Sequence, residues 1–308
     1  MQVIHSSKPR FRLGQLAAHV VVALIALVVI GGATRVMEAG LACPDWPLCY
    51  GSFLPGRQMN LQVFLEWFHR LDAFFVGLVL ITQFVLSLYW AKSLPKWLPW
   101  TYGVLTFLVA FQGFLGALTV LQLLPSLIVV AHLAVAFSLV AIMSGVTQQL
   151  LSPGESIFSP GLRFLGFASL FSVIGQSLLG SRVATSWAAH RCLNFGDSCN
   201  LLGLHRVSAF PVSLLVILFV IISFTQRDVF IDQWPYLLII TFLIISQIFL
   251  GVFSIKLGMS EPSLVIGHQL VACLLVAVLS ALNFKGRGIN RSSQSLLITE
   301  STLETCHG

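Results

Sequence analysis

Residues 65–90 read LEWFHRLDAFFVGLVLITQFVLSLYW. Ionisable side chains gather near the start of this stretch, with Glu66, His69 and Arg70 in its first two turns, and the remainder is mainly apolar. A helix of about 20 apolar residues is long enough to cross the hydrocarbon core of a bilayer. The stretch therefore predicts a membrane-spanning helix that carries ionisable groups close to one of its ends.

The composition of the whole chain extends this prediction to most of its length. Of the 308 residues, 57% are hydrophobic and only 9% are charged, whereas a soluble domain carries about 25% charged residues. Because so few charges cannot cover a water-exposed surface, most of the chain must face lipid or other helices. The net charge of +6 rests on few groups, so we expect membrane lipid as a partner and no nucleic acid.

Eight apolar segments of suitable length can be placed along the chain. They lie at residues 15–36, 65–90, 100–121, 126–150, 162–183, 202–224, 235–256 and 262–284. Two longer loops cover residues 37–64 and 184–201. The basic N-terminus leads into the first segment without a small-residue cleavage site, so no cleavable signal peptide is expected. The predicted fold class is an all-α integral membrane protein with eight transmembrane helices.

The chain also repeats itself. The residues that match at a distance of 136 positions are His69 with His205, Arg70 with Arg206, and His132 with His268. The sequence QGFLG at residues 112–116 is echoed by QIFLG at 247–251. We therefore expect two tandem four-helix bundles, residues 1–150 and 151–285, followed by a flexible tail at 286–308. Because each half holds an even number of spans, the internal repeat is predicted to be parallel.

The distribution of lysine and arginine predicts the orientation in the membrane. With the N-terminus inside, ten of these residues fall on the inner side and seven on the outer side, which is the usual bias. We therefore expect both termini on the cytoplasmic side and both longer loops outside.

Each of the two outer loops carries a pair of cysteines. The pairs are Cys43 with Cys49 and Cys192 with Cys199. Cysteines close in sequence on the oxidising side of a membrane are expected to form disulfides. The two bonds could hold the loops over a site, or they could exchange electrons with a thiol partner or with a reaction at the site.

Four histidines share one position in the pattern of spans. His69, His132, His205 and His268 each lie within about two turns of the start of the second, fourth, sixth and eighth span, so all four have a similar depth near the outer side. Two imidazoles at one depth can occupy both axial positions of a haem iron, and a four-helix bundle can hold the macrocycle. Histidines that serve only packing, or that bind zinc, are the alternatives, although zinc ligands usually cluster more closely.

The two halves differ at one position that bears on chemistry. Glu66 lies three residues before His69 and therefore on the same helix face, whereas the matching residue in the second half is Leu202. This difference favours chemistry in the first half and electron transfer or a structural role in the second. The alternative is that Glu66 is an ordinary interfacial acid near a helix N-terminus.

Arginines lie beside the histidines at the outer ends of the spans. A guanidinium at this depth can pair with the propionate carboxylates of a haem, or it can extend to the interface without a specific partner. The candidate propionate partners are Arg35, Arg70, Arg182 and Arg206.

Taken together, these motifs resemble the haem A synthase family over residues 12–285. The motifs that carry the resemblance are EWFHR at 66–70, CPDWPLC at 43–49, His132, LHR at 204–206 and GHQ at 267–269. The resemblance implies a membrane oxidoreductase that converts the methyl group at ring position 8 of haem O to a formyl group. The product, haem A, would serve cytochrome oxidase, which places the protein in a plasma or other energy-transducing membrane.

The resemblance also implies roles for the candidate residues. Substrate haem O would lie in the first half, between His69 and His132, with Glu66 as the catalytic acidic residue. A haem b cofactor would lie in the second half, with its iron between His205 and His268. A protohaem farnesyltransferase that makes haem O and an unidentified electron partner are the expected protein partners.

Two other functions compete with this interpretation. A non-catalytic bis-histidine membrane cytochrome b would carry electrons, but a transmembrane carrier should hold haems near both faces, whereas all four histidines lie near one. A transporter is suggested by the internal repeat, but the paired helix interruptions that mark a midplane site are missing from the sequence.

Overall fold

The computed structural model describes residues 8–154, 156–196 and 199–286. Within these residues the chain is helical, and the few extended pairings are isolated bridges. The long helices are α1 (Lys8–Val36), α2 (Leu61–Tyr89), α3 (Leu98–Leu121), α4 (Ser126–Leu151), α5 (Pro160–Thr185), α7 (Cys199–Thr225), α8 (Arg227–Lys256) and α9 (Pro262–Phe284). The short ones are η1 (Gly56–Gln58), η2 (Ala91–Ser93) and α6 (Ala188–Phe195).

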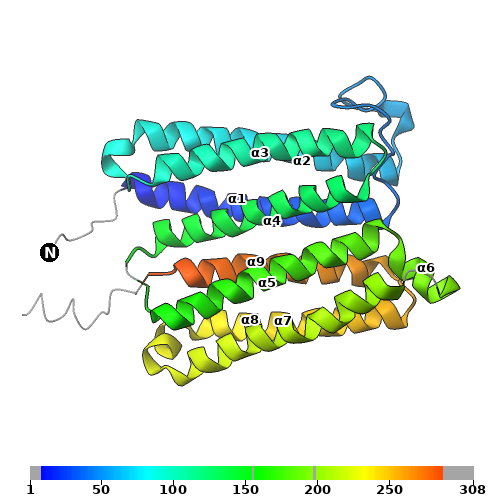
Figure 1. The fold of residues 1–308 in the computed structure, drawn as a ribbon. Helices are drawn as coiled ribbons and strands as arrows, with labels where there is room; N and C mark the ends of the chain where they lie inside the picture. Colours follow the sequence, from blue (N-terminus) through cyan, green and yellow to red (C-terminus); the bar gives the residue numbers. More distant parts are fainter. Residues whose placement is uncertain (1–7, 155, 197–198, 287–308) are drawn as a thin grey trace, which may run out of the picture.

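Eight helices of the described chain are long and apolar enough to cross a membrane. This confirms the predicted all-α fold with eight spans in an integral membrane protein. In Figure 1 the eight helices run alongside one another, with α1–α4 in the upper part and α5, α7, α8 and α9 in the lower part. The loop that follows α1 and the short helix α6 lie at one end of the bundle, which we call the loop end.

The two sets of four helices share one apolar core, and α9 lies at its centre. Half of the most apolar part of α9 is buried, against 22–28% for the other seven spans. Helix α9 packs against α1, α4 and α5 as well as its neighbour α8, and one continuous cluster of buried residues runs from α1 to α9. The remaining spans therefore turn most of their apolar surface outward, as a lipid environment requires. The division into repeated halves stays a prediction.

Two spans begin well before their predicted apolar boundaries. Helix α1 starts at Lys8 instead of residue 15, and α8 starts at Arg227 instead of residue 235. Arg10 shows what the extra turns do, since its guanidinium donates hydrogen bonds to the Gln149 and Leu150 carbonyls at the end of α4. These carbonyls have no partner within their own helix. The basic residues of α1 thus cap a neighbouring helix in addition to biasing topology.

The sequence also led to predictions about the second outer loop, the tail of the chain and the side of the membrane that holds the termini. The loop at residues 184–201 contains the helix α6, which hydropathy alone did not predict because it is short and polar. The predicted flexible tail lies outside the described residues, apart from Gly286. Which side of the membrane holds the termini likewise stays a prediction.

Close packing between α5 and α9 leads to a testable difference between two glycines of α5. A Cβ atom on Gly166 would lie 2.2 Å from Oδ1 of the fully buried Asn283 on α9, whereas nothing lies within 4 Å of the same position on Gly175. Overpacking costs about 1–3 kcal/mol, so Gly166→Ala should lower the melting temperature in detergent. Gly175→Ala should leave it unchanged or raise it slightly. Equal melting temperatures would contradict the close approach of these helices.

Candidate haem-binding sites

Each of the four predicted histidine ligands lies against a glycine on the preceding span. A Cβ atom built on the glycine would approach Cε1 of the ring, at 2.9 Å for Gly31 and His69, 3.4 Å for Gly116 and His132, 2.8 Å for Gly180 and His205, and 3.0 Å for Gly251 and His268. A side chain at Gly31, Gly180 or Gly251 would displace the ring or the helix, whereas a Cβ atom at Gly116 would only touch the ring. Three of the four rings therefore occupy space that glycine leaves open, and the fourth packs directly against a glycine.

The structure brings the four histidines together in the predicted pairs. The rings of His69 and His132 are close enough for their charges to interact, and so are the rings of His205 and His268. In the first pair, Nδ1 of each ring is buried and has no hydrogen-bond partner. Unpaired buried polar atoms are rare and need an explanation. A pair of neighbouring imidazoles fits a group whose iron takes two axial histidines, and a histidine bound through Nε2 would carry its proton on the unpaired Nδ1.

The second pair is held by glutamine side chains. Gln176 on α5 places Nε2 3.1 Å from Nδ1 of His205 and donates a hydrogen bond of 2.7 Å to the backbone carbonyl of the same residue. Gln247 on α8 contacts both ring nitrogens of His268. Its backbone carbonyl oxygen lies 3.1 Å from Nδ1, and its side-chain nitrogen lies 3.2 Å from Nε2. The rings of the second pair are thus contacted by side-chain amides, whereas those of the first pair interact with the backbone carbonyls of Leu27 and Gln112.

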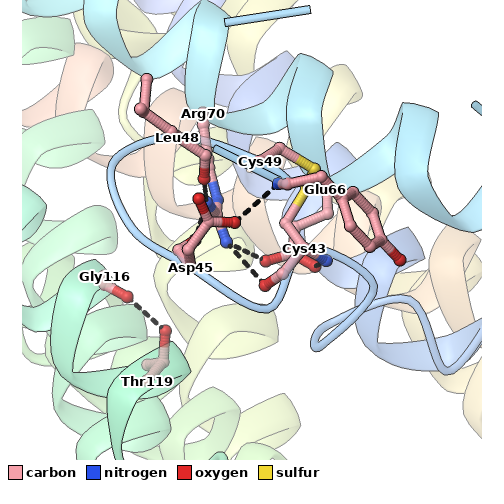
Figure 2. A network of polar contacts seen from close by, with 9 residues as sticks. Cys43, Asp45, Leu48, Cys49, Glu66, Arg70, Gly116 and Thr119 are labelled. Atoms are coloured by element: carbon pink, nitrogen blue, oxygen red, sulfur yellow. Dashed lines mark hydrogen bonds and ion pairs between the residues drawn. A yellow bond between two sulfur atoms is a disulfide. The ribbon is translucent and has the colours of Figure 1, made fainter. Parts of the chain in front are cut away.

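Glu66 is buried, and both of its carboxylate oxygens are bonded. It is 5% exposed, Oε1 forms an ion pair with Arg70 one turn later, and Oε2 accepts a hydrogen bond of 2.8 Å from the backbone N–H of Cys43. Figure 2 shows the carboxylate between the Arg70 guanidinium and the loop that carries Cys43. The loop closed by the Cys43–Cys49 disulfide is therefore attached directly to the candidate catalytic residue.

Arg70 connects this loop to α2 through several carbonyl groups. Its Nη1 donates hydrogen bonds of 2.6 Å to the Asp45 and Leu48 carbonyls, and its Nη2 reaches the Cys43 carbonyl at 3.4 Å. These contacts hold the loop over the start of α2 (Figure 2). The guanidinium that the sequence suggested for a haem propionate is thus engaged with Glu66 and the loop.

Asp45 organises the same loop from within. Its carboxylate accepts hydrogen bonds of 2.7 Å and 2.8 Å from the backbone N–H groups of Tyr50 and Gly51. The Gly51 bond is the largest cause of a lowered pKa at Asp45, and the Tyr50 bond and the charge of Arg70 act in the same direction. Gly51 has a φ of +69°, a left-handed conformation that favours glycine. The turn therefore needs glycine at this position.

The other candidate arginines have no such contacts. Within the described residues, the guanidinium groups of Arg35, Arg182 and Arg206 make no hydrogen bond or ion pair. One of them lies on the first set of helices and two on the second. They remain candidate partners for carboxylate groups of a ligand.

The loop end of the second half is built differently. The Cys192–Cys199 disulfide links α6 to the start of α7. Leu202, which replaces Glu66 in the repeat, is buried in a small apolar cluster with Val183, Ala188 and Ala189. In the second half Leu202 thus makes an apolar contact with α6, whereas in the first half the Glu66 carboxylate is bonded to the loop.

Sequence reasoning missed the glycines and the glutamines around the rings. Gly116 and Gly251 could have been identified from the sequence, because both end the repeated QxFLG pattern four residues after a glutamine. Gly31 and Gly180 were obscured, since the similar stretches GATRV at 32–36 and GSRV at 180–183 differ in length and align Gly32 with Gly180. Gln176 has no counterpart in the first half and therefore gave no repeat signal.

The ion pair inside the loop contact gives a second testable prediction. Arg70→Met leaves the buried Glu66 without its cation, and breaking such a pair costs about 3 kcal/mol. We expect a clear fall in the melting temperature in detergent and faster proteolysis between residues 43 and 56. Arg57→Met, at an exposed arginine of the same loop, is the control and should change neither. Loss of stability in both variants alike would argue against a specific role for Arg70.

The chain was compared with known proteins. It is 31% identical over 187 residues to the heme A synthase of Shewanella oneidensis, covering 54% of this chain and 55% of that protein. The identity to the heme A synthase of Rickettsia akari is 27% over 320 aligned positions, covering 83% of this chain and 92% of that protein. The match to the Bradyrhizobium diazoefficiens heme A synthase, at 31% over 198 residues, covers 53% and 55%.

In two of these three comparisons the chain spans about half the length of the curated relative it matches. The family match is more extensive, since residues 15–280, which include all four histidines and Glu66, fit the family described as cytochrome oxidase assembly protein. The chain therefore belongs to the COX15-CtaA family of cytochrome oxidase assembly proteins.

Proposed function

We propose that this protein is a haem A synthase, a membrane oxidoreductase that converts the ring methyl at position 8 of haem O to the formyl group of haem A. The observation that carries the proposal is the buried Glu66 carboxylate, one helical turn from His69 and bonded to Arg70 and to the Cys43 amide. The relatives named heme A synthase support the same activity. An electron carrier without catalysis would not need this carboxylate in one half alone.

The first half is proposed to bind the substrate. His69 and His132 would take the iron of haem O, and the glycine contacts that place their rings on neighbouring spans support this assignment. The farnesyl chain of haem O is apolar, so a site among helices whose outer surface is apolar suits it. Glu66 offers a fixed carboxylate beside the ligand, able to accept a proton from the reacting carbon or to stabilise positive charge there. Arg35 would pair with a propionate.

The second half is proposed to retain haem b between His205 and His268. Bound there, this group would supply one-electron chemistry next to the substrate site. Gly180 and Gly251 make room for the rings, and Arg182 and Arg206 have no partner within the described chain and would pair with the propionates. Oxidation of a methyl group also requires an electron partner, and haem O must come from a protohaem farnesyltransferase.

Substitution of Glu66 tests the catalytic proposal. Glu66→Gln, co-expressed with a haem O-producing farnesyltransferase, should keep bound haem and lose about 99% or more of the haem A made by wild-type protein, since general acid–base groups contribute about 10²–10⁴-fold. The measurement is chromatography of extracted pigments. Glu261→Gln, at an exposed acid that begins α9, is the control. Normal haem A from the Glu66→Gln variant would make Glu66 structural, and a wild-type protein that yields only haem b and haem O would refute the synthase.

Separate substitutions of the histidines test the division between substrate and cofactor. His205→Ala and His268→Ala should each remove the low-spin haem b spectrum, because a second axial ligand is then missing. His69→Ala should reduce bound haem O while haem b stays. His19→Ala, at a histidine whose Nδ1 lies 2.8 Å from the Gln15 carbonyl of its own helix, should change neither pigment. Retention of the full low-spin signal after loss of His205 would overturn the ligand assignment.

A further inference from the structure

The side-chain amide of Gln176 is bonded at both of its ends. Its nitrogen contacts Nδ1 and the carbonyl of His205, and its oxygen accepts a hydrogen bond of 2.7 Å from the hydroxyl of Ser208. Ser208 lies one turn after His205 on α7, and Gln176 lies one turn before Gly180 on α5. The ring of His205 is therefore held between a glycine that gives it space and an amide that orients it.

The corresponding position in the first half is apolar. Gly31 makes the same contact with His69 that Gly180 makes with His205, and the residue one turn before Gly31 is Leu27. Residues four apart lie on one face of a helix, so Leu27 occupies the place of Gln176. The position of Ser208, three residues after the histidine, is taken by Asp72. Nδ1 of His69 consequently has no side-chain partner, and the ring interacts with the backbone carbonyl of Leu27 instead.

The other two histidines show the same contrast. Both have a glutamine four residues before their glycine, Gln112 for His132 and Gln247 for His268. Only Gln247 bonds the ring, whereas Nδ1 of His132 and Oε1 of Gln112 are buried without partners. A side-chain amide thus contacts both histidines of the second half and neither histidine of the first, whose rings interact with the backbone carbonyls of Leu27 and Gln112 instead.

We propose that Gln176 is a positioning residue that makes the second pocket hold its haem, and that its absence from the first half lets haem O and haem A exchange. This inference rests on the proposed function, because it takes His205 and His268 as ligands of a retained haem. A ligand whose ring is already oriented loses less conformational freedom on binding. A synthase needs one haem that stays through many turnovers and one that leaves after each, and the glutamine supplies this difference.

Ligation through Nε2 also explains why an amide suits this place. With iron on Nε2, the proton of His205 resides on Nδ1 and needs an acceptor. If the Gln176 side-chain amide flips, so that its oxygen and nitrogen exchange places, Oε1 accepts that proton. The bond that the amide nitrogen donates to the His205 carbonyl is then lost. The amide nitrogen then donates to the Ser208 hydroxyl oxygen, whose single proton turns from Gln176 to the Leu204 carbonyl, 2.7 Å away. At His268 the amide of Gln247 must leave Nε2, while its backbone carbonyl stays on Nδ1.

The test is the rate at which purified protein loses haem b to excess apomyoglobin, followed by absorbance, with haem b and haem O distinguished by pigment extraction. Gln176→Leu removes the hydrogen bonds and keeps the bulk of the side chain. Loss of such a ring partner weakens metal binding by about 10–100-fold, so we expect haem b to leave about 10–100 times faster, with the release of haem O unchanged. The midpoint potential of haem b should rise as well, because the ring becomes a poorer donor.

Gln83→Leu is the matched control. Gln83 is a fully buried glutamine on α2 whose side-chain nitrogen and oxygen both lack hydrogen-bond partners. Its replacement should not alter the release of haem b. An unchanged release rate and potential in Gln176→Leu, or equal changes in Gln83→Leu, would overturn the inference while leaving the synthase proposal intact. Wild-type protein without any low-spin haem b would refute the ligand assignment on which both rest.

The reverse substitution keeps the inference falsifiable if Gln176→Leu does not fold. Leu27→Gln places an amide one turn before Gly31 and should slow the release of haem O to apomyoglobin several-fold, leaving haem b unaffected. Gln176→Glu retains an acceptor for Nδ1 and should restore slow release of haem b with a lowered midpoint potential. Faster release of haem O from Leu27→Gln, or no change, would contradict the role assigned to this position.

Discussion

An imidazole ring inside a packed helix bundle needs space that ordinary side chains do not leave. Here each of the four rings lies against a glycine of the preceding span, at Gly31, Gly116, Gly180 and Gly251. The depth of the glycine sets the depth of the ring, so one arrangement repeated four times brings the histidines to one level. Every proposal about the two sites depends on this packing, because it decides which side chains lie close to the rings.

A second constraint acts at the loop end. A carboxylate that is 5% exposed needs partners, and Glu66 finds them in Arg70 and in the Cys43 amide. The loop is thereby attached to the helix that carries His69. The Cys43–Cys49 disulfide closes the part of the loop that contacts Glu66 and Arg70. The loop cysteines and the acidic residue, which are far apart in the sequence, form one structural unit. A structural role for this disulfide follows more directly than a redox role.

The fold and the pairing of the histidines could be predicted from sequence because both leave periodic signals. Apolar runs of bilayer length indicated eight spans, and the 136-residue spacing matched His69 with His205 and His132 with His268, which placed two histidines in each half. Contacts made by single residues leave no such signal. Arg70 looked like a propionate partner because it follows a histidine, but it turns toward Glu66 and three carbonyls. The role of Gln176 depends on which face of α5 meets α7, which periodicity does not reveal.

The differences between the halves are more informative than their similarity. Equal glycine contacts mean that either half can accommodate paired imidazoles, so the scaffold does not decide which haem is changed. The two halves carry different residues at three matched positions: Glu66 in the first half against Leu202 in the second, Leu27 against Gln176, and Asp72 against Ser208. Two of the three residues in the first half are acids, whereas Gln176 and Ser208 in the second half form hydrogen bonds beside His205. Under the proposed function, a few side chains on a common arrangement of helices separate reactivity from retention.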